Sequence, residues 1–148
     1  SSHVKEGLTL AKRHKLPQPI MDAIEQHHGN GLISYFYHKA KEQSEGESEV
    51  PEAEYRYPGP QPRSKETAIM MIADTVEAAS RTLEDPKPSR IRSLIRRLMN
   101  DKIQAGQLSD SNLTLADLKK IEDAFVKVLI GIFHARIDYP TGETEQRA

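Results

Sequence analysis

The chain has 148 residues, with 21 basic and 22 acidic side chains and a formal net charge of −1 at pH 7. A chain of this length forms one ordinary domain. The balanced charge gives no general attraction to nucleic acids or anionic membranes, so we expect no DNA-binding or other nucleic-acid-binding role. Cysteine is absent, which excludes disulfides, thiolate metal sites and a cysteine nucleophile. No apolar run approaches the roughly 20 residues that a membrane-spanning helix needs.

Apolar residues recur at helical spacing along almost the whole chain. The expected helices cover residues 4–15, 19–28, 32–42, 67–83, 91–105 and 114–132. The helical pattern is already under way at Ser2 and His3, which suggests that the chain is part of a longer protein. No stretch alternates with a period of two for long enough to indicate a strand. The sequence therefore predicts an all-α domain.

Several helix ends carry recognisable signals. Pro17 disfavours helix in the residue before it, and Gly106 is placed to end the fifth helix. Thr114 and Asp117 have the spacing of a capping box at the start of the last helix. The fourth helix is apolar on nearly every side between Ala68 and Ala73, and we expect it to be the central one.

An acidic, proline-rich insertion, residues 43–63, interrupts the helical pattern. It has five glutamates, four prolines and few side chains to bury, so we expect an extended or mobile connector. Tyr55 and Tyr57 leave a role as a lid or docking segment open. The domain is expected to span residues 1–140, and residues 141–148 to form a disordered tail.

The adjacent pair His27 and His28 is the first candidate site. Two neighbouring imidazoles project in different directions, and a purely structural role would need two buried hydrogen-bonding environments. His3 begins a helix one turn before Gly7, where a neighbouring backbone can approach. His14, in a basic run, has a simpler explanation in solvation, and His134 in the helix dipole. His38 lies in an aromatic stretch and could belong either to the core or to a site.

Asp74 is the second candidate, because it lies in the nearly apolar stretch AIMMIADTVEAA. An isolated buried carboxylate is costly, and this position is not a helix cap. A structural alternative is a buried ion pair, for which Arg81 is the nearest partner. The functional alternative is a metal ligand, because a cation supplies the missing charge. Three imidazoles and one carboxylate from separate helices suit a divalent transition metal, and we favour that interpretation.

Four stretches resemble a known family: HVKEGLTLAKRHKLP, IEQHHGNGLISYFYHKA, YRYPGPQPRSKETAIMMIADTVEAASRTL and LTLADLKKIEDAFVKVLIGIFHARIDYP. They are similar to the cytoplasmic HD domain of bacterial seven-transmembrane HD phosphodiesterases, which hydrolyse cyclic di-AMP. The resemblance runs from His3 to about Pro140. It implies an HD-domain-like helical bundle with two divalent metals, iron or manganese, bound by histidine and aspartate.

Carried over to this chain, the resemblance makes His3, His27 and His28 ligands of one metal. Asp74 would complete the shell of the other metal, and Asp74 and His28 would serve catalysis. The adjacent His-Asp pair that defines the family does not occur in these residues, and the resemblance implies that it lies upstream of His3. The chain then corresponds to the later part of an HD domain, lacks its first helices, and can hold at most one of the two metals.

The implied reaction opens a cyclic dinucleotide to a linear one by attack of hydroxide generated between two metals. Substrate contacts are assigned to Gly29, for close approach of a phosphate, and to Tyr35, for stacking on adenine. Lys39 and Arg81 could face phosphate. Each of these four residues also has an explanation in packing or solvation.

Two alternatives to a cyclic di-AMP phosphodiesterase remain open. One is another HD-type nucleotide phosphohydrolase, and the other is a non-catalytic helical signalling or interaction domain. The resemblance favours the phosphodiesterase, because it extends well beyond the ligands. It also implies a cytoplasmic domain of a bacterial protein that is anchored upstream in the inner or plasma membrane, and it leaves a homodimer open.

Overall fold

The structure is a computed structural model that describes residues 2–44, 50–84 and 86–137. These residues form α-helices and one short 3-10 helix, and their only β pairing is an isolated bridge between Leu32 and Arg56. The helices are α1 (Ser2–Arg13), α2 (Gln18–Gln26), α3 (Ser34–Gln43), η1 (Glu52–Tyr55), α4 (Lys65–Ser80), α5 (Pro88–Gln104) and α6 (Leu115–Ile137). The predicted all-α class is confirmed. The predicted tail, residues 141–148, lies outside the described residues.

The helix-end signals act as the sequence suggests. The backbone N–H of Thr114 donates to the carboxylate of Asp117, and the N–H of Asp117 donates to the Thr114 hydroxyl, so the capping box at α6 is complete. Gly106 has φ of +69°, the left-handed conformation that ends a helix with little strain in glycine. At α4 the cap is Ser64, whose side chain accepts a hydrogen bond from the Thr67 N–H.

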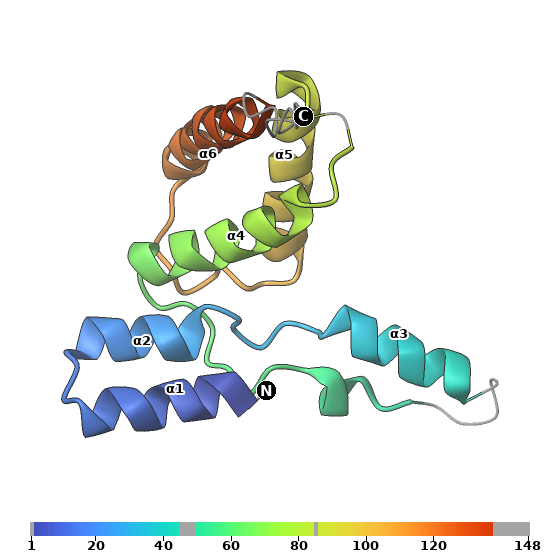
Figure 1. Cartoon of the computed structure of the whole chain (residues 1–148). Helices are drawn as coiled ribbons and strands as arrows, with labels where there is room; N and C mark the ends of the chain where they lie inside the picture. Colours follow the sequence, from blue (N-terminus) through green and yellow to red (C-terminus); the bar gives the residue numbers. More distant parts are fainter. Residues whose placement is uncertain (1, 45–49, 85, 138–148) are drawn as a thin grey trace, which may run out of the picture.

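The helices other than α3 form two groups, the α1–α2 pair and the α4–α5–α6 bundle, which meet where α2 packs against α4. Helices α1 and α2 form an antiparallel pair, and α4 packs against both α2 and α5, which in turn packs against α6 (Figure 1). The main core lies among α4, α5 and α6, and its buried members are Ile72, Val76, Ile91, Ile95, Met99, Ile121, Val126 and Leu129. Thus α4 connects the α1–α2 pair to the larger core, which places its outer face beside the end of α2.

A charged ladder joins α5 to α6 along one side of this core. Glu122 is buried and accepts hydrogen bonds from the guanidinium groups of Arg92 and Arg96. These partners hold the pKa of Glu122 below its usual range, with Arg96 making the largest contribution. Each charge in the ladder has an opposite partner, so the buried carboxylate is stabilised.

The insertion is more structured than the sequence suggests. Residues 45–49 lie outside the described residues, but the second half contains η1 and pairs with the loop after α2. The Ile33 N–H donates to the Tyr55 carbonyl at 2.7 Å, and the Tyr57 N–H donates to the Gly31 carbonyl at 3.0 Å. Pro62 is fully buried. Outside η1 the described part of this half has no helix or strand and remains an extended connector, but its backbone and one proline have partners on the domain, which the sequence did not predict.

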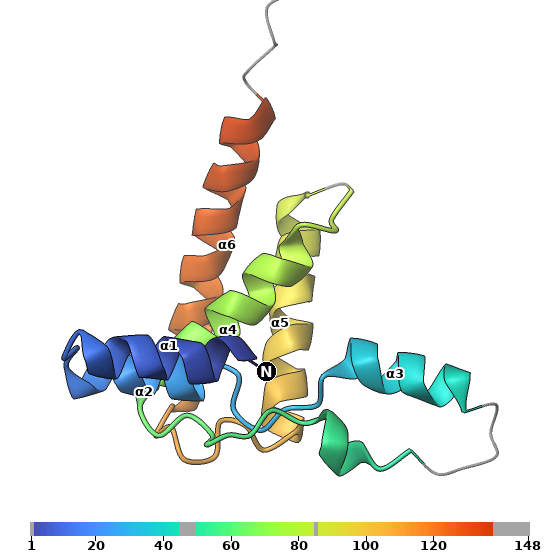
Figure 2. The same cartoon turned by 60° about the horizontal axis from the view of Figure 1, so that its bottom comes forward.

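Helix α3 lies apart from the main body. Figures 1 and 2 both show it projecting to one side, with the η1 segment beside it. It contains no buried residue. Tyr35 and Phe36 are 70% and 57% exposed and contact each other edge to face.

Helices α4 and α6 are less completely covered than their apolar sequences predict. Ile69 and Met70 of α4 are exposed, and on α6 it is Val126 and Leu129 that are buried, whereas Val128 and Ile132 are exposed. An apolar groove of about 210 Å³ lies between the two helices. Among the described helices none is both long enough and apolar enough to cross a membrane.

Candidate metal centre

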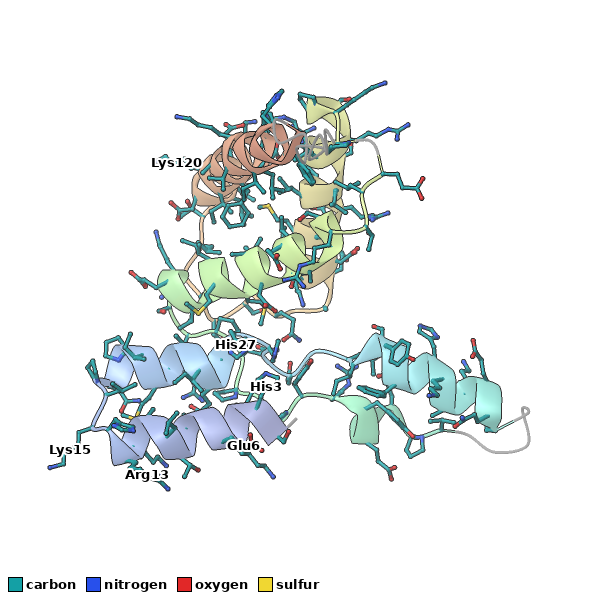
Figure 3. All side chains as sticks on the ribbon, in the orientation of Figure 1. His3, Glu6, Arg13, Lys15, His27 and Lys120 are labelled. Carbon is teal, nitrogen blue, oxygen red and sulfur yellow. The ribbon has the colours of Figure 1, made fainter. Side chains whose placement is uncertain are left out.

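Three imidazoles meet where the first turn of α1 faces the end of α2. One ring nitrogen from each of His3, His27 and His28 lies within 4.8 Å of the other two. The Nε2 atoms of His3 and His28 are 2.9 Å apart, and the His27 and His28 ring centroids are 4.0 Å apart. Figure 3 shows His3 and His27 close together between the two helices. The structure therefore brings together the three residues that the sequence singles out as ligands of one metal.

Local structure fixes the orientation of His27. It follows the last residue of α2, and its Nδ1 lies 3.0 Å from the Ala23 carbonyl and 2.9 Å from the Ile24 carbonyl. Carbonyl oxygens can only accept, so in the neutral tautomer Nδ1 carries the proton and the lone pair is on Nε2. A hydrogen bond of this kind sets the tautomer of metal-binding histidines.

Gly7 allows α1 and α2 to approach closely enough for this meeting. A Cβ at Gly7 would lie 3.0 Å from the Ile24 side chain, tighter than ordinary van der Waals contact. The sequence suggested that a neighbouring backbone would approach Gly7. The atom that approaches it belongs instead to a side chain of α2. Val4 and Ala11, seven residues apart on α1, are both buried.

Asp74 differs from its sequence-based description. Its side chain is 52% exposed, so the expectation of a buried carboxylate was wrong. Arg81 is not its partner, because the Arg81 Nε donates to Glu77 at 2.9 Å. Asp74 nevertheless faces the histidine cluster: its Oδ2 lies 3.7 Å from Nδ1 of His28, the ring nitrogen opposite the one that faces His3. Asp74 thus lies beside the three-imidazole group without being a member of it.

The environment of His28 keeps its imidazole neutral. Partial burial, together with the neighbouring His27, lowers the pKa of His28 to about 4, although Asp74 acts in the opposite direction. The Tyr57 ring stacks on His28 with centroids 4.3 Å apart and an angle of 21° between planes. A neutral imidazole with a lone pair on one nitrogen is the form that binds a metal.

Two residues of this neighbourhood were missed at the sequence level. Tyr57 was noted only as part of a lid or docking segment, yet it covers one face of His28. Lys102, in the last turn of α5, is partly buried, and burial lowers its pKa while the nearby Asp74 raises it. Both lie far from His28 in sequence, so no local spacing links them; an aromatic residue among prolines was the only available signal for Tyr57.

Protein side chains occupy the space beside Gly29 where a substrate phosphate was expected to approach. The φ of Gly29 is +57°, and a Cβ there would lie 2.3 Å from the Gln107 Oε1 and 2.8 Å from the Met71 Cε. The space beside this glycine is therefore filled by protein side chains. The phosphate contact expected of Gly29 is not supported on that side of the residue.

Substituting alanine for Gly29 should therefore destabilise the fold. We expect a loss of at least about 1–2 kcal/mol of unfolding free energy from the left-handed φ alone, and a further loss from displacement of Gln107. The matched control is Gly31→Ala, because a Cβ there lies 3.6 Å from its nearest neighbour and the φ is not left-handed. Thermal unfolding of both variants checks this; equal melting temperatures would contradict the role given to Gly29.

The remaining expected substrate residues lie away from the three imidazoles or already have partners. Tyr35 and Lys39 are exposed on α3, and Arg81 is paired with Glu77 just after α4. Their roles stay predictions. His14 and His134 are exposed, in agreement with solvation and with a position near a helix end. His38 is exposed as well, so it is not a core residue.

The donor set fits a divalent transition metal. Histidine nitrogens bind such ions at about 2.0–2.1 Å, so neighbouring ligand nitrogens are about 3 Å apart. The 2.9 Å separation between His3 and His28 matches this spacing. His27 presents its unprotonated nitrogen, and Asp74 supplies a nearby negative charge. Imidazole and carboxylate donors without thiolates suit iron, manganese or zinc in preference to copper(I).

An all-helical domain that gathers three imidazoles at facing helix ends is a helical metal-binding domain by its architecture and donor set. No protein-family model matches the chain, but the comparison with individual proteins is specific. The chain is 45% identical over 139 residues to the cyclic-di-AMP phosphodiesterase PgpH of Bacillus subtilis (strain 168) and 43% identical to that of Listeria monocytogenes. These matches cover 94% of the chain and 19% of each relative, so the chain spans about a fifth of their length.

Solved structures agree with the sequence match. The HD domain of Listeria monocytogenes PgpH superposes with a TM-score of 0.80 at 42% identity, covering 90% of this chain and 61% of that one. The same domain in complex with cyclic-di-AMP gives a TM-score of 0.81, covering 88% and 60%. The chain is therefore homologous to the PgpH HD domain and corresponds to about three-fifths of it, which confirms the resemblance and the HD-domain-like fold.

Proposed function

We propose that this chain is part of a metal-dependent phosphodiesterase domain that hydrolyses cyclic di-AMP to a linear dinucleotide. The observation that carries the proposal is the convergence of His3, His27 and His28 in a domain homologous to the PgpH HD domain. The crystal structure of that relative with cyclic-di-AMP supports the choice of substrate. Nothing comparable supports a non-catalytic helical role.

The ligands divide into two groups in this proposal. His3, His27 and His28 hold one divalent ion, iron or manganese. Asp74, on the other side of the His28 ring, binds the second ion together with ligands upstream of His3. The chain alone then has a nearly complete shell for the first ion and a single ligand for the second.

The chemistry explains why both groups are needed. A pair of divalent ions supplies hydroxide near neutral pH and neutralises charge on the phosphoryl oxygens during in-line attack. Residues of this chain would hold the metal-binding imidazoles in fixed orientations. The backbone carbonyls at the end of α2 keep His27 in one tautomer, and Tyr57 restricts the His28 ring by stacking on it.

Lys102 and Tyr57 add a substrate-facing side to the proposed site. Lys102 lies near both Asp74 and His28: its charge lowers the pKa of His28, and Asp74 raises the pKa of Lys102 against the larger, opposite effect of burial. A partly desolvated ammonium near a metal site is suited to a phosphate oxygen. We place one phosphate of the substrate between Lys102 and the metals. Tyr35 and Lys39 are exposed on α3, and Arg81 is paired with Glu77; no contact with the three imidazoles among the described residues supports their proposed roles as substrate contacts.

Asp74 gives the most direct catalytic test of this assignment. In a polypeptide that extends upstream through the His-Asp pair, Asp74→Ala should reduce hydrolysis of cyclic di-AMP by at least about 100-fold, since even outer partners of metal ligands contribute about 10- to 100-fold. The helical content should not change, because the carboxylate is half-exposed.

Glu66→Ala is the matched control for Asp74→Ala. It removes an exposed carboxylate from the first turn of the same helix and should leave the rate within about twofold. Activity of more than a few per cent in Asp74→Ala would show that this carboxylate does not bind a metal. Hydrolysis of other nucleotides in preference to cyclic di-AMP would favour the broader class of HD-type nucleotide phosphohydrolases.

The proposed cellular setting rests on the same homology. We propose that the chain is a cytoplasmic domain of a bacterial protein that is anchored in the membrane by a segment upstream. A homodimer through the apolar groove between α4 and α6 is a further proposal, supported by the exposure of Val128 and Ile132.

A further inference from the structure

Gln107 is a buried amide with an unusual place in the fold. It lies two residues beyond the C-cap of α5, and its side chain is only 2% exposed. Its backbone N–H donates to the Lys102 carbonyl at 3.0 Å, and the Gly106 N–H donates to the Ile103 carbonyl at 2.9 Å. These two bonds define a Schellman motif, in which the position of Gln107 is commonly apolar. A buried amide there is costly unless its hydrogen bonds are made.

All the bonds of this amide are directed at the turn after the histidine pair or at its own loop. The Gln107 Nε2 donates to the Asn30 Oδ1 at 2.7 Å and to the Ala105 carbonyl at 3.3 Å. The Gln107 Oε1 accepts from the Asn30 N–H at 3.2 Å. One amide, 77 residues away in sequence, thus bonds both the backbone N–H and the side chain of Asn30. Asn30 also accepts exposed hydrogen bonds, from the Gln61 Nε2 at 3.3 Å and from the Arg56 guanidinium at 3.2 Å.

Gly29 makes this contact close enough to fix the turn. The Gln107 Oε1 occupies the place where a Cβ of residue 29 would be, at 2.3 Å. The Gly29 N–H donates to the Gln26 carbonyl at 2.9 Å, and this closes the turn that carries both histidines. Moving Gln107 would therefore remove the only buried side chain that bonds the turn after His27 and His28 among the described residues, and would leave that turn to the exposed hydrogen bonds of Asn30.

We propose that Gln107 is a positioning residue for the three-histidine metal site: it holds the Gly29–Asn30 turn and thereby keeps His27 and His28 directed at His3. The inference rests on the metal site proposed above, and it adds a residue from the end of α5 to the α1–α2 pair. The end of α5 thus contributes to the site through Gln107 and, one turn earlier, through Lys102.

The test uses Gln107→Met, which keeps the length of the side chain and removes its hydrogen bonds. Cobalt(II) is the probe, because its visible spectrum reports both affinity and coordination geometry. We expect the dissociation constant for cobalt to rise by about 10-fold, the lower end of the effect of losing a group bonded directly to a metal ligand, because Gln107 acts through the Gly29–Asn30 turn; the spectrum should change as well. Asn30→Ala, at an exposed position, should give a smaller change in the same direction while the fold is retained.

The matched control is Ser111→Ala in the same loop. The Ser111 hydroxyl is fully buried but bonds only within the loop, donating to the Leu108 carbonyl at 2.7 Å and accepting from the Leu113 N–H. This variant should lower the melting temperature without changing cobalt affinity. If Gln107→Met and Asn30→Ala are destabilised but keep the wild-type dissociation constant and spectrum, Gln107 is a purely structural residue and the inference is overturned.

A metal-free measurement separates this inference from the proposed function. In the unaltered chain the stacked rings of His28 and Tyr57 should give nuclear Overhauser effects, since their centroids are 4.3 Å apart. These effects should weaken in Gln107→Met and persist in Ser111→Ala. Loss of the effects together with an unaltered chain that binds no cobalt would refute the metal site and retain the positioning role. Unchanged effects in Gln107→Met would refute the positioning role.

Discussion

Replacing His28 with alanine should remove metal binding from this chain. Its Nε2 lies 2.9 Å from that of His3, and its ring is adjacent to that of His27, so it is the member of the group that contacts both others. With one of three imidazoles gone, we expect the affinity for manganese(II) or iron(II) to fall by at least about 100-fold, more than the loss of an outer partner produces. Calorimetric titration of the unaltered chain and the variant measures this effect.

His14→Ala is the control for that titration. It also removes an imidazole, but one that is exposed near the end of α1 and lies outside the three-histidine group. Its metal affinity should equal that of the unaltered chain. If His28→Ala binds the metal as tightly as His14→Ala, the ion is held elsewhere and the assignment of the three ligands is wrong.

The second large effect concerns the rate of hydrolysis. We expect the 148-residue chain to hydrolyse cyclic di-AMP orders of magnitude more slowly than a polypeptide extended upstream through the His-Asp pair. The chain supplies three imidazoles for one ion but only Asp74 for the other, and the attack on a phosphodiester depends on charge shared by two ions.

The comparison requires equal metal occupancy in both polypeptides. Rates should be measured with iron(II) and with manganese(II), after the bound metal has been quantified. Equal rates at equal occupancy would mean that the catalytic site lies wholly within these residues, which would contradict the two-group arrangement of ligands. A metal-loaded extended polypeptide that leaves cyclic di-AMP intact would instead refute the proposed substrate.

The sequence predicted the helices well where local chemistry determines them. Capping by Thr114 and Asp117 and the left-handed Gly106 depend on neighbours a few residues away, so the pattern alone located both ends. The meeting of three histidines depends on packing between α1 and α2. It was anticipated because the paired imidazoles needed partners and because the resemblance supplied His3.

Long-range packing accounts for what the sequence could not give. Asp74 has apolar neighbours, but burial depends on which face of α4 is covered, and this face remains half-exposed. The same reason applies to Val128 and Ile132 on α6, since helical spacing identifies an apolar stripe but not the side on which another helix packs. Gln107 and Tyr57 reach the site from distant segments, and a single sequence contains no spacing that connects them to His28.

The central claim is that His3, His27 and His28 bind one divalent metal, and anomalous diffraction from crystals of the manganese-loaded chain tests it most directly. The account predicts one peak at the manganese absorption edge, bonded to all three imidazoles at about 2.0–2.3 Å, with the His27 Nδ1 still donating to the carbonyls at the end of α2. A map at full manganese saturation with no peak among these rings would contradict it.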